Sequence, residues 1–189
     1  MKKFESYEKV EAYQDVEKLP PGGYIIGILG ATEKTESWGD ILEIAFDISE
    51  GEHKNYYSNQ YKNNTQSEDK KFKGIYRMNV PKEDGTEQDT WTARRFKTDM
   101  MAIEASNPGF HWDWDEKKLI GKAVGAIFFE KEYDFQGKQG FFATPHSFKD
   151  VESIRSGKFK VPKPKLLKDK PGLGSNFEDL DIKDGDLPF

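Results

Sequence analysis

The sequence predicts a mainly β (α+β) domain of five strands, with one helix between the third and the fourth strand. Aromatic side chains make up 14% of its 189 residues, which is more than a fully disordered chain carries. Short runs of β-branched and aromatic residues alternate with glycine- and proline-rich turn signals over residues 20–150. One stretch in the middle has apolar residues at helical spacing. These observations favour a folded, β-rich domain.

The first half of this domain is expected to contain three strands. Residues 24–29 are a short β-branched and aromatic run that follows the turn signal Leu-Pro-Pro-Gly-Gly. Residues 41–48 alternate as a half-buried strand does, with Ile44, Phe46 and Ile48 on one face and Glu43, Ala45 and Asp47 on the other. Residues 53–62 and 71–80 are the remaining strand candidates, and they form a long or broken third-strand region.

The run that follows residue 90 predicts the helix. Phe96, Met100 and Ile103 recur at spacings of four and three residues, which places them on one helical face. Asp89 or Thr90 can serve as the N-cap, and an Asn-Pro-Gly sequence ends the helix.

The last two strands are expected at residues 121–135 and 140–148, joined as a hairpin across a Gln-Gly-Lys turn. This order of strands and helix is that of the OB-fold, a five-stranded and partly open Greek-key barrel. We therefore expect an OB-fold-like barrel domain over residues 20–150, preceded by an N-terminal extension over residues 1–19.

Charge separates the end of the chain from this domain. The whole chain has a net charge of −5. Residues 155–170 contain seven basic residues and one acidic residue, whereas residues 178–189 contain five acidic residues and one basic residue. Residues 151–174 are therefore expected to be a basic linker rich in lysine and proline. Residues 175–189 are expected to be a disordered acidic tail that recruits a partner.

Composition disfavours several classes of protein. The chain has no cysteine, so it forms no disulfide and no thiolate site. Its longest apolar stretch, residues 119–129, is too short and too interrupted to span a membrane. The first residues lack the apolar segment of a signal peptide, so a cytoplasmic location is expected. No phosphate-binding loop, nucleophile elbow or zinc-binding histidine pair is present, so we expect no enzyme, catalytic residue, metal or cofactor.

The last residues have the features of a short protein-binding motif. A terminal phenylalanine offers its ring to an apolar pocket and its carboxylate to a basic residue, while a proline limits the loss of chain entropy on binding. Neighbouring acids attract basic partner surfaces. The predicted partner-binding residues are Asp184, Asp186, Leu187, Pro188 and Phe189.

The ending DGDLPF resembles the C-terminal tip of bacterial single-stranded DNA-binding proteins. The segments LPPGGYIIGILG, ESWGDILEIAFDISEG, NYYSNQYKN and NPGFHWDWDEKKLIGK are similar to proteins of phages and integrated elements of Gram-positive bacteria. The resemblance implies an OB-fold domain that binds single strands and a tip that recruits host or phage replication, recombination and repair proteins. It also implies a nucleoid-associated protein in the cytoplasm of a bacterial host. The helix, the WDWD sequence and the third-strand region depart from the common bacterial protein, so its DNA contacts do not transfer.

DNA contacts are therefore predicted from physical chemistry. A protein that binds single strands without sequence preference needs aromatic rings on which bases stack, beside cations that follow the phosphates. Residues 54–62 and 71–77 interleave both kinds of side chain, and Trp38, Lys131 and Tyr133 extend the set. The predicted DNA-binding residues are Trp38, Lys54, Tyr56, Tyr57, Tyr61, Lys62, Lys71, Phe72, Lys73, Tyr76, Arg77, Lys131 and Tyr133. Phe72 and Tyr76 share a strand face with Met78, so they are the rings most expected in the core. The lysines of the basic linker could contact phosphates or the acidic tail.

Three other functions stay open from the sequence. An adaptor would use the same tail to capture replication and repair proteins while binding DNA poorly. A recombination mediator or annealing protein would bind single strands and also accelerate their pairing. A nuclease would use the carboxylates around Asp113. The oligomeric state is open as well, and a homo-oligomer is one option.

Overall fold

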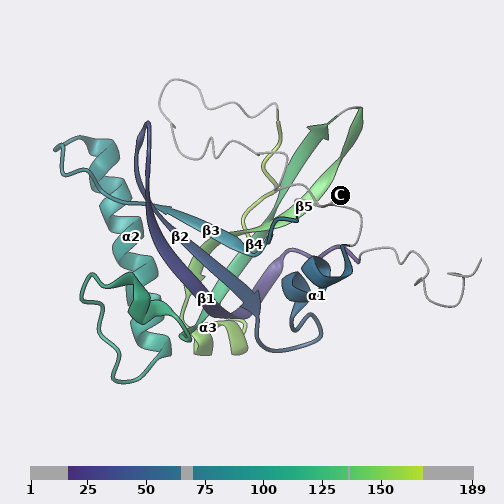
Figure 1. Cartoon of the computed structure of the whole chain (residues 1–189), viewed down its shortest axis with the longest axis horizontal. Helices are drawn as coiled ribbons and strands as arrows, with labels where there is room; N and C mark the ends of the chain where they lie inside the picture. Colours follow the sequence, from purple (N-terminus) through teal and green to yellow (C-terminus); the bar gives the residue numbers. More distant parts are fainter. Residues whose placement is uncertain (1–16, 65–69, 136, 168–189) are drawn as a thin grey trace, which may run out of the picture.

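The computed structural model describes residues 17–64, 70–135 and 137–167 (Figure 1). Its elements, in chain order, are β1 (Gly22–Glu36), β2 (Gly39–Ile48), α1 (Tyr56–Asn63), β3 (Ile75–Asn79), α2 (Glu87–Ser106), the 3-10 helix η1 (Glu116–Leu119), β4 (Ala123–Phe135), β5 (Lys138–Lys149) and α3 (Val151–Arg155). The mainly β class predicted from the sequence is confirmed. Among the described residues, no helix is long and apolar enough to cross a membrane.

The five strands form one antiparallel sheet in the order β3-β2-β1-β4-β5. β1 lies at the centre, and the two long hairpins β1–β2 and β4–β5 project from the body of the domain (Figure 1). β3 and β5 are the edge strands, and backbone pairing does not close the sheet between them. A closed barrel is therefore not confirmed.

The predicted helix between β3 and β4 is present as α2. Its N-cap is Thr86, whose side chain accepts a hydrogen bond from the Asp89 amide at 3.1 Å, so the N-cap lies a few residues earlier than predicted. Phe96, Met100 and Ile103 are buried, as their spacing predicted. The described residues contain two further α-helices, α1 and α3, so the prediction of a single helix was wrong.

The largest error in the strand prediction concerns residues 53–62, most of which lie in α1 rather than in a strand. Asp47 at the end of β2 explains this difference. Its carboxylate accepts hydrogen bonds from the Tyr57 amide at 3.0 Å and the Ser58 amide at 2.9 Å. These are first-turn amides that a helix leaves without intrahelical partners, and a negative charge is favourable there. The signal that favours the helix thus comes from a different element.

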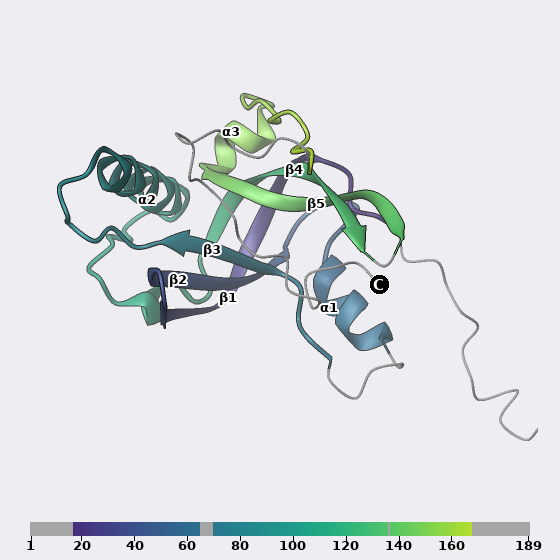
Figure 2. The same ribbon diagram turned by 90° about the horizontal axis from the view of Figure 1, so that it is seen from above.

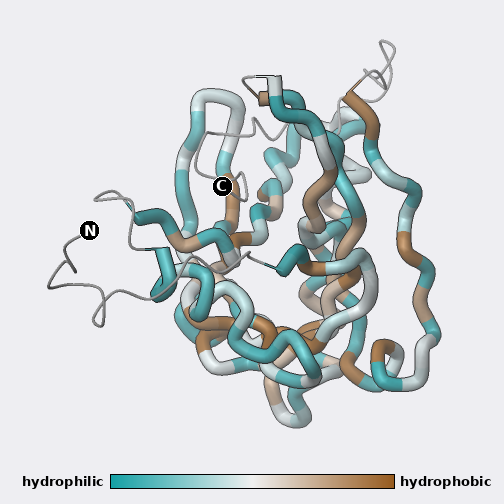
Figure 3. The backbone as a smooth tube through the Cα atoms, turned by 90° about the vertical axis from the view of Figure 1, so that its right-hand side faces the viewer, coloured by the Kyte–Doolittle hydropathy of each residue, from teal (hydrophilic) through white to brown (hydrophobic). Residues whose placement is uncertain are grey.

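The main core lies inside the curved sheet, between α2 at one end and α1 at the other (Figure 2). Ile44, Phe46 and Ile48 of β2 are completely buried there, together with Phe128 of β4. Figure 3 shows how apolar segments, in brown, alternate with polar ones along the chain. The residues of β2 that face the core are those that the alternating pattern predicted.

A side-chain network joins the two edge strands where backbone pairing is absent. Asp99 of α2 is 1% exposed. Its carboxylate accepts hydrogen bonds from the Tyr76 hydroxyl of β3 and the Phe148 amide of β5, both at 2.8 Å. The rings of Tyr76 and Phe148 pack with centroids 4.6 Å apart, and Arg95 donates a hydrogen bond to the His146 carbonyl. We call these five residues the β3–β5 seam.

The segment that follows β5 lies on the opposite face of β1 and β4 from the main core. Ile25, Ile127 and Ile154 form a second apolar cluster, against which Phe159 packs. Lys165 forms an isolated parallel bridge with Lys131 of β4. The described part of the predicted basic linker thus contains helix α3 and a stretch that contacts the domain.

Candidate nucleic-acid interface

Aromatic rings gather around α1. Tyr61 and Phe72 have centroids 6.2 Å apart, and Phe72 lies 6.4 Å from Tyr57. Tyr57 in turn contacts Tyr56 edge to face at 5.1 Å. The rings meet mostly edge to face, an arrangement that aromatic pairs prefer. Residues 53–62 and 71–73, which are separate in the sequence, therefore form one cluster.

The rings of this cluster differ in exposure. Tyr61 is 41% exposed, and Tyr56 and Phe72 are half-buried. Tyr57 is buried against Phe46, and burial raises the pKa of its hydroxyl above the ordinary value. The ring of Tyr57, one of the predicted DNA contacts, is therefore packed in the core and is not part of the accessible surface. Tyr61 is the most accessible stacking surface of the cluster.

Positive charge surrounds these rings. The described residues 53–64 and 70–73 contain five lysines and no acid, while the sequence between them contains Glu68 and Asp69. The side chains of Lys54, Lys62 and Lys71 are exposed, and Lys73 is half-buried. Lys70 places its Nζ 5.6 Å from the centroid of the Tyr61 ring. The α1 surface, defined as Lys54, Tyr56, Tyr61, Lys62, Lys70, Lys71 and Phe72, therefore combines accessible rings with cations.

Two predicted residues of β3 have structural contacts instead. Tyr76 is buried in the β3–β5 seam, and burial raises the pKa of its hydroxyl well above the ordinary value. Arg77 donates a hydrogen bond to Glu43 at 3.0 Å, and Lys34 donates one to the same carboxylate at 2.6 Å. Tyr76, which shares a strand face with Met78, is therefore a core residue. Arg77 belongs to a ladder of charges across β1, β2 and β3.

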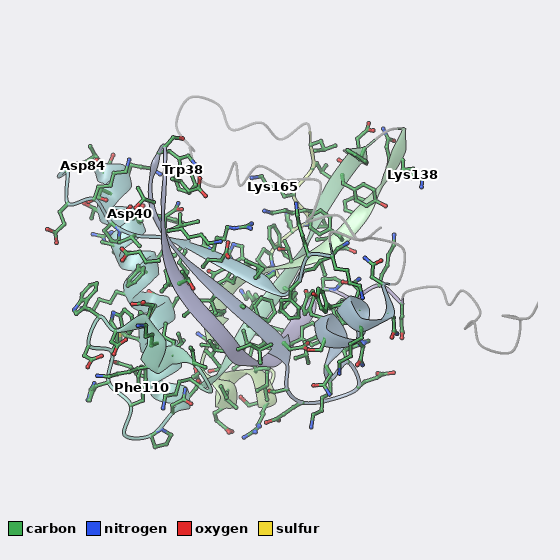
Figure 4. The ribbon with its side chains drawn as sticks, in the orientation of Figure 1. Trp38, Asp40, Asp84, Phe110, Lys138 and Lys165 are labelled. Carbon is green, nitrogen blue, oxygen red and sulfur yellow. The ribbon has the colours of Figure 1, made fainter. Side chains whose placement is uncertain are left out.

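The other predicted residues lie on the two hairpins. Trp38 is 47% exposed in the β1–β2 turn, and Figure 4 shows it near the tip of that hairpin. Tyr133, another predicted DNA contact, is buried, and the centroid of its ring lies 6.2 Å from that of Phe142. Lys131 is half-buried, with its Nζ 5.7 Å from the centroid of the Phe129 ring. These residues are not part of the α1 surface.

Sequence reasoning missed two rings and one cation beside α1. Tyr24 of β1 lies 5.9 Å from His53, and His53 lies 6.4 Å from Tyr56. Burial, with smaller contributions from Tyr56 and Glu52, raises the pKa of Tyr24 to about 12. No local pattern connects Tyr24 to this cluster, because β1 brings it there from elsewhere in the chain. Lys70, the missed cation, follows a polar stretch and carried no strand signal.

The predicted partner-binding residues, Asp184, Asp186, Leu187, Pro188 and Phe189, lie outside the described residues. Among the described residues, no group of three or more histidine or acidic side chains could hold a metal ion. The carboxylate of Asp113, the centre of the nuclease alternative, forms an ion pair with Lys118.

No protein-family model matches this chain. No curated protein matches it either.

Proposed function

We propose that this protein binds single-stranded DNA without sequence preference and protects it during phage or mobile-element replication and recombination. The α1 surface is the observation that carries the proposal. Its exposed ring, Tyr61, can stack on a base, at about 1–3 kcal/mol per base, while its lysines attract phosphates of any sequence.

The strand order supports an OB-like domain within this proposal. In an OB-fold, strand 1 pairs with strands 2 and 4, and closure occurs between strands 3 and 5. The observed order, β3-β2-β1-β4-β5, is the same order opened between β3 and β5, and α2 occupies the position of the OB-fold helix. OB-folds bind oligonucleotides through strands 2 and 3 and the loops between strands 1 and 2 and strands 4 and 5. Trp38 lies in the first of these loops.

The acidic tail completes the proposal as a recruiting element. The motif at Leu187, Pro188 and Phe189 would bind replication, recombination or repair proteins while the domain holds the strand. We expect Phe189→Ala to leave affinity for oligo-dT unchanged and to abolish capture of such a partner. A loss of DNA affinity in this variant would contradict the separation of the two roles.

The test is fluorescence anisotropy of labelled oligo-dT with the full chain, with unlabelled single strands of mixed sequence and duplex DNA as competitors. We expect single strands of different sequence to compete similarly and the duplex to compete weakly. The affinity should fall as salt rises, because bound phosphates release counterions. If no binding occurs at low salt, the proposal fails and the adaptor becomes the better explanation of the tail.

A further inference from the structure

Residues 158–167 pack against the domain. Phe159 contacts the second apolar cluster, which contains Ile25, Ile127 and Ile154. The fit is close at Gly23, where an added Cβ atom would lie 2.6 Å from Cζ of the Phe159 ring. Glycine at this position therefore leaves the space that the ring occupies.

Hydrogen bonds hold the same segment to β4. The Lys165 amide donates to the Glu130 carbonyl and the Glu132 amide donates to the Lys165 carbonyl, both at 2.9 Å. The Leu167 amide donates to the Glu132 carboxylate at 3.1 Å. β1 pairs with β4 only as far as Phe128. Lys165 therefore pairs with the part of β4 that lies beyond its pairing with β1.

The docked segment is strongly basic. Residues 158–167 contain four lysines and no acid. Lys158, Lys160 and Lys163 are exposed, and Lys165 lies opposite Lys131 across the parallel bridge. In the view of Figure 4, Lys165 lies between the hairpin tips marked by Trp38 and Lys138. Proline at 162 and 164 favours an extended chain and removes two backbone donors.

We propose that residues 158–167 form a phosphate-binding strip of the single-strand-binding surface, together with Lys131. This inference rests on the proposed function. The strip presents several cations on a backbone that is fixed to β4, and its one aromatic ring, Phe159, is packed into the second cluster. It therefore contacts phosphates rather than bases, while the α1 surface supplies the rings. Fixed cations lose less conformational entropy on binding than those of a free linker.

Charge removal tests the strip in the full chain. The variant with Lys158, Lys160 and Lys163 all changed to Gln is compared with a control in which Lys97, Lys117 and Lys118 are changed to Gln. Both variants change the net charge equally, and all six lysines are exposed. Loss of three phosphate contacts should reduce the slope of log affinity for oligo-dT against log salt concentration by about 2 in magnitude. The control should leave the slope unchanged, and equal slopes for the two triple variants would overturn the inference.

Docking is tested separately with Phe159→Ala, which keeps every charge. Hydrogen exchange of the Lys165 and Glu132 amides, both hydrogen-bonded in the structure, reports whether the segment has left β4. We expect faster exchange and a reduced salt slope together. Faster exchange with an unchanged slope would show that the lysines act without docking and would overturn the inference.

The outcomes separate the two proposals. If the unaltered chain binds no oligo-dT, the proposed function fails, whatever the exchange data show. If it binds but the lysines of the strip prove indistinguishable from the control lysines, only the strip is refuted.

Discussion

Replacing Asp99 should test how the open sheet is held together. The carboxylate is buried and joins the Tyr76 hydroxyl of β3 to the Phe148 amide of β5, each at 2.8 Å. Asp99→Ala leaves the amide without its acceptor and opens a cavity. The Arg95 guanidinium, which donates to the His146 carbonyl in the same seam, would lose a nearby negative charge.

The expected cost of this change can be estimated from these contacts. Removing one partner from a buried charged network destabilises a protein by about 3–5 kcal/mol. Asp99→Asn should cost less, about 1–3 kcal/mol, because the amide oxygen can still accept from Phe148 while the Tyr76 hydroxyl donates to the His146 carbonyl at 3.2 Å. Tyr76→Phe should cost about 1.5–3 kcal/mol, because the buried Asp99 carboxylate loses a hydrogen-bond donor.

Urea unfolding, followed by circular dichroism, measures these differences in the free energy of unfolding. A double-mutant cycle between Tyr76→Phe and Asp99→Asn should give a coupling of about 0.5–3 kcal/mol, because the two side chains are in contact. An Asp99→Ala variant that lost less than about 1 kcal/mol would refute a structural role for the seam.

Three further predictions concern the α1 surface and the ionisable side chains. Tyr61→Ala should lower the affinity for oligo-dT by about 1–3 kcal/mol. Trp91 is a similarly exposed ring on α2, and Trp91→Ala should leave the affinity unchanged. Equal effects of the two variants in anisotropy titrations would contradict the assignment of Tyr61 to the binding surface. Partial burial raises the pKa of Glu43, but hydrogen bonds from Lys34 and Arg77 outweigh it and lower the pKa below its ordinary 4.5. The stabilisation from Glu43 is therefore present above that value and is lost as pH falls through the lower folded-state pKa, and Glu43→Gln should flatten the pH dependence of the urea midpoint in this acid range. Burial raises the pKa of Tyr24 from 10.0 to about 12, so its contribution to stability is lost as pH rises between those values. A tyrosinate absorbance titration in which every tyrosine ionised near pH 10 without unfolding would contradict this burial.

Local patterns in the sequence predicted those elements whose signal lies within the element itself. Phe96, Met100 and Ile103 are buried because their spacing matches a helix packed along one face. The alternation over residues 41–48 likewise matches β2, whose apolar side faces the core. Residues 53–62 were assigned wrongly because Asp47 caps α1 from a neighbouring strand.

The candidate site was predicted only in part, because a ring's exposure depends on what other elements place beside it. Residue type alone could not separate Tyr57, which faces the core, from the exposed Tyr61 a turn later on the same helix. Tyr76 hydrogen-bonds to Asp99, a pairing across 23 positions that no short motif reveals. The docking of Phe159 depends on Gly23, which is far from it in the sequence. From the sequence alone, this basic stretch with prolines therefore resembles a free linker.

Binding of oligo-dT, followed by intrinsic fluorescence at low and high salt, is the most direct test of the proposed function. It should be performed on the full chain and on a chain ending at Ser175, which retains every described residue. We predict saturable quenching that weakens with salt and persists without the tail. Trp38→Phe should reduce the change in signal if the ring at the hairpin tip contacts the strand. If neither chain is quenched and neither binds in anisotropy, the protein is not a single-stranded DNA-binding protein.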